Sequence, residues 1–177
     1  MGESKGSGRV LVVGVGNEYR RDDGIGPIIA RCMKGMMIEG VDVMEVDDAS
    51  KLLDVMQMGY SRIIVIDAMH SHGNAPIGTI HRFNKEELLD TRVQRLLSSS
   101  LSPPSSTHAM DVVEALGLAA ALGYTQGMDV VLLGIEGRDF GVGRGLSKEL
   151  EERIDVIVGE VVKALMVMVK DRVSSNA

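Results

Sequence analysis

Aromatic residues are the scarcest class in this sequence: they make up 3% of its 177 residues, and tryptophan is absent. Proteins that bind single-stranded nucleic acid stack the bases on aromatic rings, and binding to phosphates needs a positive surface. The chain instead carries a formal net charge of −6. These two features disfavour a nucleic-acid-binding role, and we expect no nucleic-acid partner.

Cysteine and long apolar runs are also scarce. The single cysteine, Cys32, can form neither an internal disulfide nor a cysteine-based metal site, which favours the cytoplasm, and we expect it to pack within a helix. The opening residues MGESKGSGR lack the apolar core of a signal peptide. The most apolar late stretch, residues 155–169, contains Glu160 and Lys163 and is shorter than a membrane span. We therefore expect a cytoplasmic protein without membrane insertion.

The overall composition is that of a globular protein, with 45% hydrophobic and 25% charged residues. A chain of this length is large enough to bury one core without disulfides. We expect a flexible N-terminal tail at residues 1–8, a single domain at residues 9–172 and a C-terminal tail at residues 173–177.

Short apolar runs alternate with segments of helical spacing along the chain. Continuous apolar runs are typical of strands buried on both faces, and apolar residues at helical spacing predict helices. The predicted strands are residues 9–16, 41–46, 62–67, 78–83 and 128–135. The predicted helices are residues 26–38, residues 50–58 capped by Ser50, residues 109–122, and a final helix capped by Ser147 that runs to about residue 170. The Ser- and Pro-rich residues 97–107 are predicted to form a loop.

This alternation predicts a single-domain, three-layer α/β/α fold with a mostly parallel, twisted sheet of about five strands. Connections between parallel strands are right-handed. Functional sites in such folds collect at the carboxyl ends of the strands. We therefore looked for reactive side chains where the predicted strands end.

The first such position is a glycine-rich turn, GVGNEYRRDDGIG, after the first predicted strand. A dinucleotide-binding turn needs a third small residue where this chain has Tyr19, which disfavours a nucleotide site. Asp47 and Asp48 after the second strand could nevertheless imitate a ribose-binding carboxylate. Asp22 and Asp23 precede a predicted helix, where carboxylates cap exposed amides. One of the two can cap the helix while the other faces the crevice.

Other polar residues stand at the ends of predicted elements. Asp67 closes a predicted strand, where it either begins a turn or contributes to a site. His108 precedes a predicted helix, whose positive end favours the neutral imidazole that ligates metals; a surface histidine is the alternative. His70 and His72 form an H-x-H pair that either binds a metal or lies on the surface. His81, on a predicted edge strand, is assigned no role.

Four segments, in order, resemble the hydrogenase maturation proteases: VLVVGVGNEYRRDDGIG, IIVIDAM, STHAMDVVEAL and LLGIEGRDFGVGRGLS. The resemblance runs from about residue 9 to residue 170. It implies an endopeptidase that removes the C-terminal extension of a nickel-containing hydrogenase large-subunit precursor after nickel insertion. It also implies that Asp23, Asp67 and His108 are the catalytic and nickel-recognising residues, and it leaves Asp22 for capping or for support of the site.

The resemblance implies nickel that is presented by the precursor rather than permanently bound. A set of three protein ligands leaves coordination positions open for such a metal. The chain departs from the family pattern at residues 47–50, where many members carry a Gly-Gly-Thr-like turn, and at Gly137, where a proline often stands. These departures keep a second hypothesis open, a non-cleaving, nickel-sensing chaperone or docking module for the precursor. A nucleotide-binding domain is the third.

Overall fold

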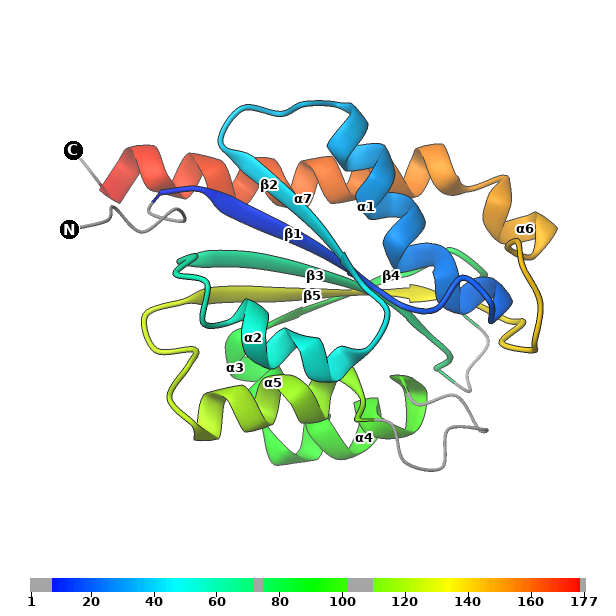
Figure 1. Ribbon diagram of the computed structural model, residues 1–177, viewed down its shortest axis with the longest axis horizontal. Helices are drawn as coiled ribbons and strands as arrows, with labels where there is room; N and C mark the ends of the chain where they lie inside the picture. The colour runs from blue at the N-terminus through cyan, green and yellow to red at the C-terminus, as the bar shows by residue number, and fades with distance from the viewer. Residues whose placement is uncertain (1–7, 72–74, 102–109, 176–177) are drawn as a thin grey trace.

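A five-stranded sheet forms the centre of the molecule (Figure 1). The structure, a computed structural model, describes residues 8–71, 75–101 and 110–175. The strands, in chain order, are β1 (Val10–Val15), β2 (Val41–Val46), β3 (Arg62–Met69), β4 (Ile80–Asn84) and β5 (Asp129–Glu136). Residues 1–7 of the predicted N-terminal tail, residues 176–177 of the C-terminal tail, His72 and His108 lie outside the described residues.

The strands lie in the order β2-β1-β3-β5-β4. The first four are mutually parallel, and β4 pairs antiparallel with β5 at one edge. Long apolar runs in β1, β3 and β5 suit these positions, because each of these strands has neighbours on both sides and helices on both faces. The predicted fold, a three-layer α/β/α arrangement around a mostly parallel sheet, is confirmed.

Helices cover both faces of the sheet (Figure 1). On one face lie α1 (Ile25–Gly35) and α7 (Ile154–Ser175), whose apolar side chains share one core cluster with the sheet. On the other face lie α2 (Leu52–Val55), α3 (Lys85–Leu89), α4 (Thr91–Leu101) and α5 (Val112–Ala121), which contribute to the second cluster. None of the described helices combines the length and the apolar character that a bilayer crossing requires.

Two glycines let α1 pack directly against the end of β1. A Cβ atom at Gly14 would stand 2.2 Å from the carbonyl oxygen of Gly26, and a Cβ at Gly26 would stand 2.1 Å from that of Val15. No side chain fits at such distances, so both positions require glycine. The start of α1 is consequently held tightly at the carboxyl end of β1.

The strand order reverses at β1 and β3. From β1 the chain passes through α1 to β2 on one side, and from β2 it returns through α2 to β3 on the other side of β1. The two connections leave toward opposite faces of the sheet (Figure 1). Such a reversal of strand order opens a crevice between the two strands, and ligands of open α/β sheets bind there.

Several sequence-based boundaries were wrong. The loop predicted from residue 97 is helical up to Leu101, where α4 ends, while residues 102–107 lie outside the described residues. Ser50 does not cap the helix that follows β2. Asp48 caps the 3₁₀ turn Ala49–Lys51 at this point, and its carboxylate accepts a hydrogen bond from the amide of Ser50. The predicted final helix is broken into α6 (Lys148–Glu151) and α7, and Ser147 precedes α6 without a side-chain capping bond.

Candidate active site

The turn after β1 carries Asp23 to the crevice. Gly16 has a φ angle of +142°, and a Cβ there would stand 1.9 Å from the carbonyl oxygen of Asp23. Only glycine allows the chain to fold back so closely. Asp23 then lies in the 3₁₀ turn η1 (Arg21–Gly24), and its Oδ2 accepts a hydrogen bond from the backbone amide of Asn17 at 2.9 Å. Close backbone packing therefore accounts for the glycines of this turn without a bound dinucleotide.

Asp67 lies deeper than its sequence position indicated. It was predicted to end its strand, but β3 continues to Met69 and the residue is only 6% exposed. Pairing between β1 and β3 stops at Ile66, so Asp67 is the first residue of β3 beyond its β1 partner and lies at the carboxyl end of β1. Within the described chain, its carboxylate accepts one hydrogen bond, from the amide of Ala68 at 2.9 Å. A buried carboxylate with one donor is poorly compensated.

Electrostatics connect Asp67 with Asp23. Burial raises the pKa of Asp67 well above its usual range, and the negative charges of Asp23 and then Asp111 raise it further against the bond from Ala68. Burial also raises the pKa of Asp23, partly opposed by the Asn17 amide and the charge of Arg20. Like charges that interact in this way favour a shared proton or a bound cation.

The structure thus brings together two of the three predicted site residues. The third, His108, lies outside the described residues. It precedes by three residues Asp111, whose side chain caps α5 through a capping box with Glu114. Among residues 8–71, 75–101 and 110–175, no three Asp, Glu, His or Cys side chains are grouped so that they could hold a metal ion. The three-residue site stays a prediction.

Asp22 has a different role from its neighbour. It is fully buried, and its two carboxylate oxygens accept bonds from the amides of Arg138 and Asp139, each at 2.9 Å, and from the amide and hydroxyl of Ser147 at 2.6 and 2.9 Å. It caps neither η1 nor α1 with its side chain. Asp22 fixes the loop between β5 and α6 against the turn that carries Asp23, and so supports the site.

A second polar cluster, which the sequence did not reveal, lies at the end of β5. Glu136 is 3% exposed; its Oε1 accepts from the amide of Ser71 at 3.0 Å and lies 3.7 Å from Nδ1 of His70. Its Oε2 lies 3.4 Å from Nε2 of His81, the histidine that was assigned no role. His70 also stacks at a tilt on Phe140, with ring centroids 6.2 Å apart. The cluster depends on the antiparallel pairing of β4 with β5, so no local sequence signal could have found it.

A groove of about 740 Å³ adjoins the turn that carries Asp23. One wall is formed by residues of that turn, including Asn17 and Tyr19, and the other by residues 45–48, Ser50 and Lys51 at the end of β2 and beyond. The segment in which the sequence departs from the family pattern therefore lines this groove. Asp23 does not line the groove itself and is connected to it through Asn17, whose amide donates to the Asp23 carboxylate.

The fold and the acidic crevice define a single-domain α/β protein with a candidate hydrolytic site at the reversal of its strand order. A model of the hydrogenase maturation protease family matches residues 29–164, and the chain belongs to that family. It is accordingly a peptidase with a role in hydrogenase maturation. A search for similar curated proteins returned no match.

Solved structures agree with this assignment. The chain is similar to the hydrogenase maturating endopeptidase HybD from E. coli, with a TM-score of 0.66 and 24% identity over 90% of this chain and 93% of that one. It is also similar to the NiFe hydrogenase maturation protease HybD from Thermococcus kodakarensis, with a TM-score of 0.66 and 26% identity over 89% and 98%. A third, HycI from the same archaeon, has a TM-score of 0.63 and 21% identity over 90% and 93%.

Proposed function

We propose that this protein removes the C-terminal extension of a nickel-containing hydrogenase large-subunit precursor in the cytoplasm, after nickel has been inserted. Asp23, Asp67 and His108 recognise the nickel that the precursor presents. The observation that carries the proposal is the electrostatic coupling of Asp23 with the buried, sparsely hydrogen-bonded Asp67 at the crevice.

The chemistry of the two carboxylates supports a cation as their ligand. They repel each other in the free protein, and a divalent metal between them would turn that repulsion into attraction. His108 would add an imidazole, a ligand type that suits nickel. Three protein ligands leave coordination positions open, so a metal still held by the precursor can be gripped without being extracted.

Peptide hydrolysis also needs a group that handles protons. A water must lose a proton as it attacks the carbonyl carbon, and the leaving amine must gain one. Asp67 suits this task because burial raises its pKa well above the usual range of a carboxyl group, which makes it a stronger base. The same burial that makes its charge costly thus makes it a candidate general base.

The test is incubation of nickel-loaded precursor with the wild-type protein, with His108→Ala and with Asp67→Asn, followed by mass spectrometry of the large subunit. We expect the wild type to shorten the precursor and both variants to be slower by about 100-fold or more. Asp129→Asn is the matched control, because Asp129 is exposed and lies at the opposite end of β5. Nickel-free precursor should stay intact.

The outcomes separate the site from the function. Equal processing by the wild type and His108→Ala would remove His108 from the site. A stable complex in which the precursor mass never changes would instead support the non-cleaving chaperone. Processing of nickel-free precursor at the full rate would contradict recognition through the metal.

A further inference from the structure

Two loops beside the site are joined into one rigid surface, called here the loop platform: residues 17–21 after β1 and residues 139–144 after β5. The amide of Arg21 donates to the carbonyl oxygen of Gly143 at 3.0 Å, and the amide of Gly143 donates to the carbonyl oxygen of Tyr19 at 2.9 Å. Nη2 of Arg20 donates to the carbonyl of Phe140 at 3.3 Å. These bonds fix the two loops before any partner arrives, which lowers the entropy lost on binding.

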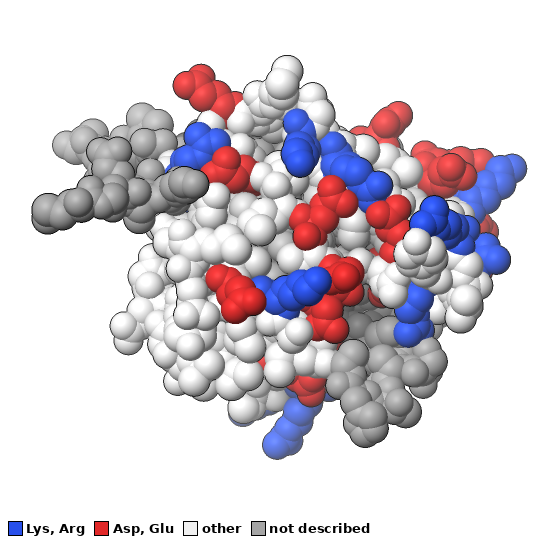
Figure 2. Space-filling model, viewed as in Figure 1, with Lys and Arg blue, Asp and Glu red and all other residues white. Residues whose placement is uncertain are grey.

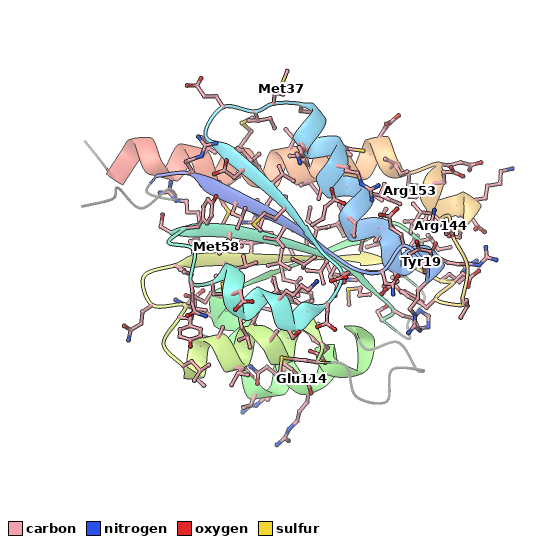
Figure 3. The ribbon with its side chains drawn as sticks, viewed as in Figure 1. Tyr19, Met37, Met58, Glu114, Arg144 and Arg153 are labelled. Atoms are coloured by element: carbon pink, nitrogen blue, oxygen red, sulfur yellow. The ribbon has the colours of Figure 1, made fainter. Side chains whose placement is uncertain are left out.

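The loop platform exposes two side chains of the kinds that dominate binding energy, Tyr19 and Arg144, and the apolar Val142. Tyr19 is 60% exposed and Val142 is 92% exposed. The guanidinium of Arg144 lies 4.3 Å from the centroid of the Tyr19 ring and also donates to its hydroxyl group, and Figure 3 shows the two side chains together. Tyrosine and arginine are enriched among residues that dominate binding energy. Here each holds the other in place, so little side-chain freedom is left to lose.

The charge of the loop platform differs from that of the whole chain. The chain has a net charge of −6, yet the platform has three arginines against two acidic residues, Glu18 and Asp139, and Arg138 adjoins it. Figure 2 shows basic and acidic side chains side by side at the right-hand end of the molecule, where Figure 1 places α6 and the loop before it. Arg21 pairs with Asp139 at 3.3 Å, whereas Arg144 has no carboxylate within 4.0 Å among the described residues. Because the guanidinium of Arg144 forms no ion pair with the described residues, its charge is complementary to an acidic partner.

We propose that the loop platform docks the folded hydrogenase precursor, with Tyr19 and Val142 burying apolar surface and Arg144 pairing with an acidic group on the precursor. This inference rests on the proposed function. Residues 17–21 lead directly into Asp23, and residues 139–144 follow the strand that pairs with β3 beside Asp67. A partner seated on the platform therefore presents its neighbouring segment to the crevice and the groove.

The experiment measures steady-state cleavage of nickel-loaded, folded precursor by Tyr19→Ala, Arg144→Ala and Arg144→Glu. We expect KM to rise about tenfold for each alanine variant and further for Arg144→Glu, while kcat stays within about twofold. Arg144→Lys keeps the charge but loses the planar stack, so its KM should lie between. Met37→Ala is the control, because Met37 is 87% exposed and follows the end of α1, away from the platform (Figure 3).

A second readout keeps this proposal separate from the proposed function. Binding of the precursor is measured for the Asp67→Asn protein and for the double variant that also carries Arg144→Glu. We expect the double variant to bind the precursor about tenfold or more weakly than Asp67→Asn alone, even if no cleavage occurs. Unchanged KM and unchanged binding would overturn the docking surface while leaving the peptidase intact. A concentration-dependent dimer that is lost in Tyr19→Ala would also overturn it, because the platform would then serve a second copy of the chain.

Discussion

Two buried aspartates, Asp22 and Asp67, have opposite surroundings. Asp22 accepts four hydrogen bonds from the loop after β5 and from Ser147, whereas Asp67 accepts one within the described chain. The pKa of Asp67 is raised well above its usual range, because burial and two neighbouring carboxylates act on it against a single donor. Burial without enough donors, rather than burial alone, makes a carboxylate a candidate functional group.

Of the substitutions that test this difference, Asp22→Ala should have the largest effect, and that effect is on stability. Asp22→Ala would leave three backbone amides of the loop without their acceptor and should lower the free energy of unfolding by about 4 kcal/mol. Urea denaturation followed by circular dichroism measures the change. The exposed Asp129→Ala should stay within about 0.5 kcal/mol of the wild type. A loss below about 1 kcal/mol for Asp22→Ala would mean that its hydrogen bonds do not hold the loop.

The different character of these two aspartates could be predicted only in part from the sequence. Apolar runs, alternation and flanking loops located the strands, and the predicted β2 agrees with the structure at both ends. They did not show that β3 continues past Asp67, because Ala68 and Met69 extend the strand only through pairing with β5. The hydrogen bonds of Asp22 reach residues 116 to 125 positions away, a distance at which no local pattern carries information.

The two unpredicted helices show the same limit. The start of α3 was readable, because Asn84 and Glu87 form a capping box at the standard spacing. The sequence of α4 is polar and rich in serine, so its composition indicated a loop, although Leu97 is buried against the sheet-facing cluster. Tertiary packing rather than helix propensity stabilises such a segment.

Asp67→Asn should have an effect of the opposite sign to Asp22→Ala. We expect it to raise the free energy of unfolding by about 1 kcal/mol at neutral pH. The raised pKa means that the folded wild type binds the Asp67 proton more tightly than the unfolded chain does. The stability of the wild type therefore falls as pH rises above about 3.9, the ordinary value for aspartate, toward the folded pKa.

The amide of Asp67→Asn does not titrate, so the gain should be small at low pH and should increase with pH. Thermal unfolding of metal-free protein across a pH series measures the difference between variant and wild type. A difference that is constant with pH would show that Asp67 ionises without penalty, and the contrast with Asp22 would then fail.

The smallest expected effects are at Asp111, where capping and charge can be separated. Asp111→Ala removes the cap of α5 and should cost about 1 kcal/mol, whereas Asp111→Asn keeps a capping oxygen and should cost less than about 0.5 kcal/mol. Both variants remove a negative charge that raises the pKa of Asp67. The pH dependence of unfolding should therefore become shallower in both, although only the alanine variant loses its cap. If only Asp111→Ala changed that dependence, the effect on Asp67 would come from the position of α5 rather than from the charge, and the three carboxylates would not act as one electrostatic group.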